Sequence, residues 1–308
     1  PMLALLIHPA WIFTSRTIDR LGKGIRTGAR DALLSEEATP ATKATVFGFH
    51  RSMDTIGAVL GPSIALIYLY FYPTDYRTLF LIAFIPGFFA VIFTRLIKEK
   101  KIPTPVTERK NKISLFAFVS YWKSSSAAYK KLLTGLLLFA LVNSSDVFLL
   151  LKMKESGISD TLIIGLYIFY NLVYALSAYP LGILADRWGI KKTFITGLFL
   201  FTMVYTGFAF AHELWLFALL LILYGFYAAA TEGIAKAWIS NITGKKEIAT
   251  ALGTYSGFQS IAALLASSIG GFLWYQFGSI TTFTISAFVT IVVIFYLTFS
   301  NIIEKETT

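Results

Sequence analysis

The segment from Arg16 to Glu37 carries charge in a chain that otherwise builds apolar segments of membrane length. On a helix with 100° per residue, one face of about 140° collects its charged side chains. These are Arg16, Asp19, Arg20, Lys23, Arg26, Arg30 and Asp31. Each charge facing lipid at mid-bilayer would cost about 3 kcal/mol. This face must therefore meet protein or water.

The composition indicates an all-α, polytopic transmembrane helical bundle. Hydrophobic residues make up 56% of the 308 residues and charged residues only 14%, which excludes an ordinary soluble domain. Segments of about 20 apolar residues span a bilayer. We predict spans at 9–36, 45–71, 76–97, 130–151, 160–183, 193–211, 213–240, 247–275 and 280–300. Residues 1–8 resemble the end of a further span, so we expect the sequence to be a fragment.

The net charge of +10 is distributed by loop rather than on one soluble face, which argues against a nucleic-acid partner. By the positive-inside rule, the basic connection 98–129 and the loops at 187–192 and 245–246 are cytoplasmic. Lys152 and Lys154 disagree, because alternation places them outside. The predicted divisions are a first helical half (1–97), a basic linker (98–129) and a second half (130–308).

The chain contains an internal repeat at a shift of 205 residues, which aligns 28–65 with 233–270 without a gap. Identical pairs include Gly28 with Gly233, Ser35 with Ser240, and Gly48 with Gly253. Parallel duplication of a helical bundle is typical of one class of secondary transporter. The repeat also bears on the alternative that 16–37 lies on the membrane surface. Its partner, 214–241, is plainly a span, which favours a transmembrane segment.

Residues 182–192, GILADRWGIKK, join two apolar segments on the basic side. They resemble the loop signature of the major facilitator superfamily. The matching positions are Gly182, Asp186, Arg187, Gly189, Lys191 and Lys192. A second segment, GAVLGP, is similar to the glycine-proline signature of antiporters through Gly57, Gly61 and Pro62, although Ala65 and Leu66 replace its closing glycines.

This resemblance implies helices 4–12 of a twelve-helix transporter with two pseudo-symmetric halves. Helices 4, 7 and 10 would then line a central cavity. It also implies a conformational latch at Asp186, which could accept from backbone N–H groups or pair with an arginine of the other half. The alternative is a solvated basic loop that only fixes topology.

Intramembrane charges outline the candidate pathway. The arginine-rich face needs more anions than it holds, and Asp54, one turn from Arg51, is a candidate. This arginine-rich face is either the wall of a cavity that binds an anionic or zwitterionic solute, or part of a structural ion network between helices. Glu232 and Lys236 have the favourable i,i+4 spacing and could simply neutralise each other.

Asn143 and Asp146 lie one turn apart in the span 130–151, and Asp146 is the only acid there. Isolated membrane acids often carry protons. We therefore expect Asp146 to exchange a proton during transport; a carboxylate held by hydrogen bonds is the alternative.

No enzyme motif, cofactor site or metal site is evident, since the three histidines lie far apart and cysteine is absent. We expect a proton-coupled secondary transporter for a small anionic, zwitterionic or drug-like solute. It would be a monomer in a prokaryotic inner membrane, with the lipid bilayer, its solute and protons as partners. A receptor or assembly partner that kept a transporter fold is the alternative.

Overall fold

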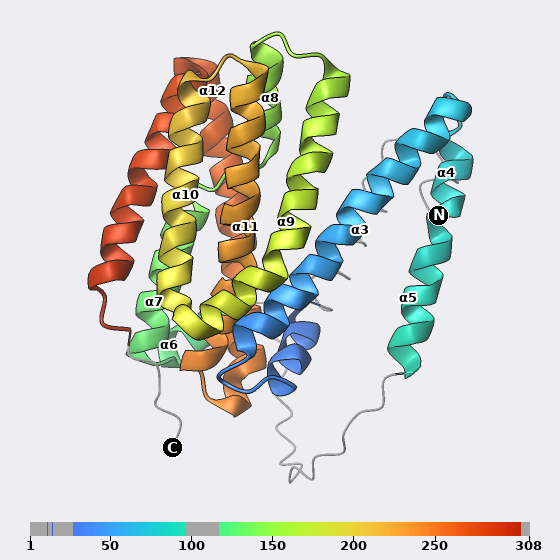
Figure 1. Ribbon diagram of the computed structural model, residues 1–308. Coiled ribbons are helices and arrows are strands. Elements are labelled where there is room, and N and C mark those ends of the chain that lie inside the picture. The colour runs from blue at the N-terminus through green and yellow to red at the C-terminus, as the bar shows by residue number, and fades with distance from the viewer. Residues whose placement is uncertain (1–10, 12–13, 15–26, 97–116, 303–308) are drawn as a thin grey trace. The chain divides into compact units, whose positions relative to one another are not determined.

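The computed structural model describes residues 11, 14, 27–96 and 117–302, and these contain helices and no strand (Figure 1). Six segments are long and apolar enough to cross a membrane: Lys43–Phe71, Tyr76–Thr94, Asp160–Trp188, Ile190–Phe210, Leu214–Ile242 and Lys245–Phe299. This confirms the all-α transmembrane class. The described chain packs as two compact units, divided within one helix between Leu60 and Gly61.

The smaller unit contains the end of α3 (Lys43–Phe71), followed by α4 (Tyr76–Ile82) and α5 (Phe84–Leu96). Asp75 caps α4, because its carboxylate accepts from the backbone N–H of Thr78 at 3.2 Å. The hydroxyl of Tyr68 donates to the same carboxylate at 2.8 Å. These contacts close the turn between the spans predicted at 45–71 and 76–97.

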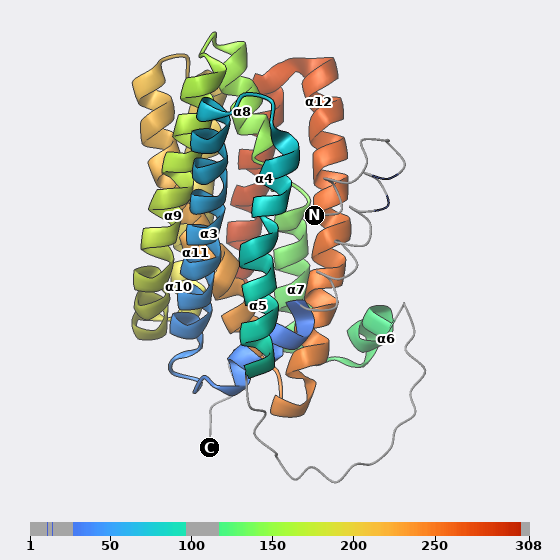
Figure 2. The same ribbon diagram turned by 90° about the vertical axis from the view of Figure 1, so that its right-hand side faces the viewer.

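The larger unit contains a helical segment at 27–36, the start of α3, and α6 to α12. Its helices are α6 (Ala117–Ser124), α7 (Ala127–Ala140), α8 (Val147–Glu155), α9 (Asp160–Trp188), α10 (Ile190–Phe210), α11 (Leu214–Ile242) and α12 (Ile248–Phe299). A 3₁₀ turn, Lys245–Glu247, precedes α12. Figure 2 shows α9, α10 and α11 side by side. Their shared core includes the fully buried Trp238, Phe194 and Phe201.

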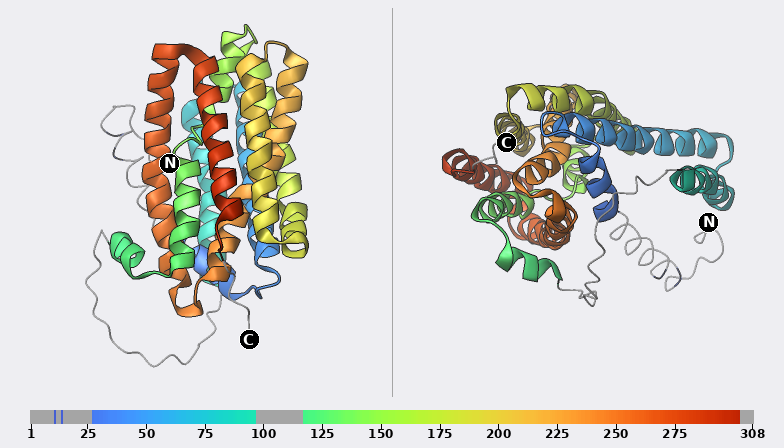
Figure 3. Two further views of the ribbon diagram at one scale, coloured as in Figure 1. Left: turned by 90° about the vertical axis from the view of Figure 1, so that its left-hand side faces the viewer. Right: turned by 90° about the horizontal axis from the view of Figure 1, so that it is seen from below.

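Helix α12 covers two of the predicted spans. Gly278 interrupts it with φ 82°, and the chain folds back on itself there (Figure 3). Glycine adopts this backbone conformation without the steric cost of a Cβ atom. The two arms match the spans predicted at 247–275 and 280–300.

The span predicted at 130–151 is not one helix. It divides into α7 and α8, with non-helical backbone at 143–145 and turns on either side. The sequence at this break is Asn143-Ser144-Ser145-Asp146. Short polar side chains compete for backbone hydrogen bonds and are weak helix formers. The expected placement of Asn143 and Asp146 on one helical face is therefore wrong.

Lys152 explains the exception to the positive-inside pattern. Its side chain is buried in α8, where its Nζ donates to the hydroxyl of Ser279 at 3.2 Å and lies 3.8 Å from Glu155. Lys154 instead forms an exposed pair with Asp160 at 3.0 Å. Both lysines lie in a helix and have partners, so neither counts as a loop charge under the positive-inside rule.

Helix α6 lies outside the predicted spans and packs against the start of α12. Trp122 contacts the ring of Phe258, and the hydroxyl of Tyr121 donates to Glu247 at 3.3 Å. Burial and the neighbouring Glu247 carboxylate raise the pKa of Tyr121 to about 12. The tyrosine therefore stays a neutral donor at this contact.

Candidate functional site

Only the end of the charged segment 16–37 falls within the described residues. Arg16, Asp19, Arg20, Lys23 and Arg26 lie outside the described residues, whereas Arg30 and Asp31 belong to the helix at 27–36. Asp31 is 1% exposed. It accepts from Arg30 at 3.1 Å and from the Nζ of Lys236 in α11 at 2.6 Å. A buried carboxylate thus joins two segments far apart in sequence.

A second set of charges lies beside this pair. Arg51 of α3 forms an ion pair with Glu232 of α11 and a 3.2 Å pair with Asp54. Its Nε donates to the hydroxyl of Tyr174 in α9, and its guanidinium lies 5.4 Å from that ring centroid. The expected local pair of Glu232 with Lys236 is not formed. Each side chain instead pairs with the segment 27–60.

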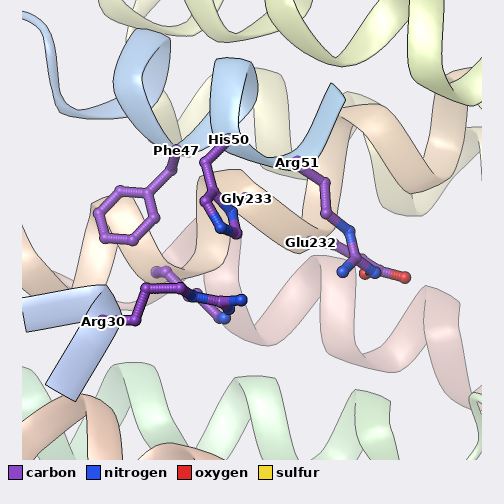
Figure 4. A pocket seen from close by; sticks show the side chains of 7 residues that line it. Arg30, Phe47, His50, Arg51, Glu232 and Gly233 are labelled. Carbon is purple, nitrogen blue, oxygen red and sulfur yellow. The ribbon is translucent and has the colours of Figure 1, made fainter. Parts of the chain in front are cut away.

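Four of these charged side chains line a small cavity of about 30 Å³, large enough for a water molecule: Arg30, Arg51, Glu232 and Lys236. Figure 4 shows Arg30 and His50 approaching it from different segments, with Glu232 and Arg51 at one end. Three cationic side chains, Arg30, Arg51 and Lys236, meet three carboxylates, those of Asp31, Asp54 and Glu232. Among these residues the charges are balanced in this conformation.

The contacts follow the internal repeat. Asp31 and Lys236 are equivalent positions, and so are Ser35 and Ser240, whose hydroxyls hydrogen-bond to each other. Away from these pairs, a residue of one repeat contacts a different position of the other repeat, and the equivalent contact is formed in return. Gly28 approaches Gly253, and the equivalent pair, Gly233 and Gly48, is also in contact. Reciprocal contacts of this kind are the mark of a two-fold interface.

Asp186 caps α3. Its carboxylate accepts from the backbone N–H of Ala44 at 3.0 Å, the N–H of Thr45 at 2.7 Å and the Thr45 hydroxyl at 2.6 Å. A helix N-terminus presents unpaired N–H groups and partial positive charge, so a carboxylate is stabilised there. Of the two partners considered for Asp186, the structure has the backbone N–H groups.

Close backbone contact allows this cap. A Cβ atom on Gly182 would lie 2.5 Å from the Ala44 carbonyl oxygen, and one on Gly48 would lie 2.5 Å from that of Ala178. Small residues let membrane helices approach in this way. Gly182, Asp186 and Arg187 all lie within α9, so most of the loop signature is helical.

The remaining motif residues are dispersed. Gly189 ends α9 with φ 104°, Lys191 donates to the carbonyls of Thr298 and Ser300, and Arg187 and Lys192 are exposed. In α3, a Cβ atom added at Gly57 or Gly61 would meet no described atom within 4 Å, and Pro62 lies inside the helix.

Asp146 and Asn143 lie at the break between α7 and α8, and both are half-buried. Asp146 accepts from the hydroxyl of Tyr224 in α11 at 2.7 Å. They are separate from the ion pairs described above, although Tyr170 contacts both Tyr224 and Tyr174 through its ring.

The sequence analysis did not find the neutral groups that hydrogen-bond to the charged side chains. The Tyr174 hydroxyl accepts from Arg51, and the Tyr224 hydroxyl donates to Asp146. The carbonyl of Ser240 accepts from Lys43 at 2.8 Å. The identity of Ser35 and Ser240 in the repeat was a usable signal for the direct contact. Among the described residues, no three His, Asp or Glu side chains gather as a divalent metal site requires.

Comparison with known proteins accounts for this arrangement. Residues 1–169 and 146–307 match the family model of the Major Facilitator Superfamily. An uncharacterised MFS-type transporter of Methanocaldococcus jannaschii is 33% identical over 282 residues, which are 88% of this chain and 68% of that protein. An uncharacterised transporter of Buchnera aphidicola is 29% identical over 147 residues, 45% of this chain and 37% of that protein.

The fold agrees with these matches. The crystal structure of the human organic anion transporter MFSD10 superposes with a TM-score of 0.77 at 15% identity, covering 96% of this chain and 73% of that one. At this identity the likeness concerns the fold alone. Together with the family match over most of the sequence, it shows that this integral, multi-pass membrane chain belongs to the Major Facilitator Superfamily.

Proposed function

We propose that the chain is part of a secondary transporter that moves a small solute by alternating access. The observation that carries this is the joining of 27–60 to α9 and α11 at the end predicted to be cytoplasmic. Ion pairs, the Asp186 cap and the Ser35–Ser240 contact all lie there. We interpret them as an inner gate in its closed state.

The gate charges have alternative partners on their own segments. Arg51 already contacts Asp54, and Arg30 already contacts Asp31. Glu232 and Lys236 stand at the i,i+4 spacing that favours a local pair. Separation of the segments would therefore leave no charge unpaired, which lowers the cost of opening in a poorly solvated region.

For the solute we propose an organic anion, a zwitterion or a drug-like molecule. Opening separates Arg51 from Glu232 and Lys236 from Asp31. Their N–H donors could then bind a solute carboxylate in competition with the local partners, Asp54 and Glu232. The human protein with this fold is named an organic anion transporter, which supports the anionic class. We place the protein in a prokaryotic plasma membrane, as a monomer.

Proton coupling is proposed at Asp146. The carboxylate is half-buried at a helix break, and it accepts a hydrogen bond from a neutral phenol, that of Tyr224. Burial without a paired cation favours the protonated acid. Protonation and release at this site would couple solute movement to a proton gradient.

Liposomes reconstituted with the full-length protein test these proposals. Counterflow is measured with labelled benzoate as the anion, glycine as the zwitterion and ethidium as the drug-like probe. We expect exchange of at least one probe, whereas absence of exchange for all three contradicts transport of these solute classes.

The coupling test uses Asp146→Asn, which should abolish uptake driven by a pH gradient and preserve exchange. The matched control is Asp160→Asn, since Asp160 is an exposed acid paired with Lys154. Proton-driven uptake that survives Asp146→Asn would exclude this carboxylate as the proton carrier.

A further inference from the structure

Several oxygen atoms lie near the break between α7 and α8, and protonation of Asp146 would occupy only one of them. Asp146 precedes α8 but makes no capping hydrogen bond to it. Its Oδ1 atom accepts from Tyr224, which leaves further lone pairs of the carboxylate available. Helix α7 ends at Ala140, on the other side of the break, and a helix C-terminus carries partial negative charge that favours a cation.

Two buried hydroxyls lack hydrogen-bond partners among the described residues: that of Ser144 at the break and that of Tyr205 in α10. Ser144 is 7% exposed and Tyr205 is 1% exposed. The Tyr205 hydroxyl lies near the hydroxyls of Ser144 and Tyr224, but without the geometry of a hydrogen bond. Leaving a buried hydroxyl without a hydrogen bond destabilises the folded state. Two such groups that share one neighbourhood point to a small polar occupant.

The groups around Asp146 leave its carboxylate without an ion-pair partner. Helices α9, α10 and α11 present tyrosines to it: Tyr167, Tyr170, Tyr174, Tyr205, Tyr224 and Tyr227. From α12, Gly270 lies against Ser144 and brings no charge. The charged group of α3 that acts on Asp146 is Arg51, which is already engaged by Glu232 and Tyr174. No ion pair to Asp146 is formed among the described residues.

We infer that Asp146, Ser144, Tyr205 and Tyr224 form a binding site for a monovalent cation, Na⁺, which competes with the proton at Asp146. This inference rests on the proposed coupling role of that carboxylate. A proton neutralises the acid but leaves the Ser144 and Tyr205 hydroxyls idle. Sodium takes only oxygen ligands, and broken helices in transporters commonly supply them from side chains and unwound backbone.

The test is binding of ²²Na⁺ to the purified full-length protein, with choline replacing sodium to hold ionic strength constant. We expect saturable binding at alkaline pH that is lost on acidification. Asp146→Asn should abolish it, and Ser144→Ala and Tyr205→Phe should each weaken it roughly tenfold, about 1.4 kcal/mol. Ser145→Ala, an exposed neighbour in the same break, is the matched control and should bind normally.

A second measurement covers variants that do not fold. Sodium should raise the Tm of the unaltered protein relative to choline, because it binds only the folded state, and acidification should remove this rise. Absence of both saturable binding and a sodium-dependent Tm overturns the inference. Equal binding by folded Ser144→Ala, Tyr205→Phe and the parent also overturns it.

Counterflow separates this failure from failure of the proposed function. Exchange of benzoate, glycine or ethidium in sodium-free buffer, together with no sodium binding, removes the sodium site and leaves the transporter. Sodium binding without exchange of any probe removes the proposed transport and leaves the site.

Discussion

Asp31 and Lys236 occupy equivalent positions of the internal repeat, carry opposite charges and contact each other at 2.6 Å. Ser35 and Ser240, one turn further along, repeat the relationship with identical residues. Residues that meet their own repeat equivalents lie close to a pseudo-two-fold axis. The two sides of the Asp31–Lys236 pair therefore have similar backbone surroundings, and the charge could sit on either side.

Exchanging the two charges in a double variant should restore the stability of the closed state that each single substitution removes. Asp31→Lys and Lys236→Asp each replace the ion pair between the two segments by two like charges, which we expect to cost about 3 kcal/mol in the closed state. The double variant should recover most of this loss. Recovery should be incomplete, because the exchanged lysine would lie beside Arg30 and the exchanged aspartate would stand one helical turn from Glu232, so each meets a like charge.

The Ser35→Cys/Ser240→Cys pair measures closure directly. These side chains hydrogen-bond to each other, and the chain contains no other cysteine. Disulfide yield should fall in each single charge variant and return in the exchanged one. A double variant as poorly cross-linked as either single variant would contradict the symmetry argument.

Asp186 should stabilise the closed gate through charge at the start of α3. Asp186→Asn keeps one acceptor oxygen but loses the negative charge, so we expect a loss of about 1 kcal/mol in closure. Thr45→Val should have a smaller effect, because it removes one of three hydrogen bonds. Cross-linking of the 35/240 cysteine pair again measures the change.

Arg187→Gln is the control for Asp186. Arg187 follows Asp186 in the same helix but is exposed. If neutralising Arg187 reduced closure as much as Asp186→Asn, general loop charge rather than the cap would be responsible.

The sequence predicts the helices well where apolar length decides them, as in α9, α10 and α11. It fails at 141–146, where Asn143 to Asp146 tip the balance from helix to turn within an apolar segment. Hydropathy cannot detect such a break, because it sums over a window that Leu136 and Leu149 dominate.

The contacts of the candidate site were also only partly predictable from the sequence. The repeat makes Asp31 and Lys236 equivalent positions, but their contact was not predicted from the sequence. Local spacing instead suggested a pair of Lys236 with Glu232, which the structure does not have. Partners such as Tyr174 depend on how α3 packs against α9, and no periodicity in the sequence contains that information.

Asp75 provides a pH test outside the membrane spans. The Tyr68 hydroxyl and the contacts with Thr78 lower the pKa of this carboxyl in the folded chain. A depressed folded pKa means that the cap contributes stability above the unfolded pKa, near ~3.9, and loses it as pH falls through the folded value. The protection factor for amide hydrogen exchange at 75–78 should therefore be high at neutral pH and fall on strong acidification.

Tyr68→Phe should move this loss of protection to higher pH, because it removes the first cause of the lowered pKa. Tyr72→Phe is the control, since the Tyr72 ring packs against the Tyr68 ring with centroids 5.1 Å apart, whereas the hydroxyl that bonds Asp75 belongs to Tyr68. An unchanged pH profile in Tyr68→Phe would show that the Thr78 contacts alone set the titration.

Gly48 and Gly253 are equivalent in the repeat but should respond oppositely to the same substitution. A Cβ at Gly48 would lie 2.5 Å from a backbone carbonyl of α9, which cannot move without displacing the helix. We expect Gly48→Ala to destabilise the protein by about 2 kcal/mol through overpacking.

At Gly253 a Cβ would meet no described atom within 4 Å. Gly253→Ala should therefore stabilise its helix by about 1 kcal/mol, because alanine loses less backbone entropy on folding than glycine. Thermal unfolding of the two variants should move Tm in opposite directions. A fall of equal size in both would refute the close packing of α3 on α9 as the cause, because only Gly48 lies at that contact.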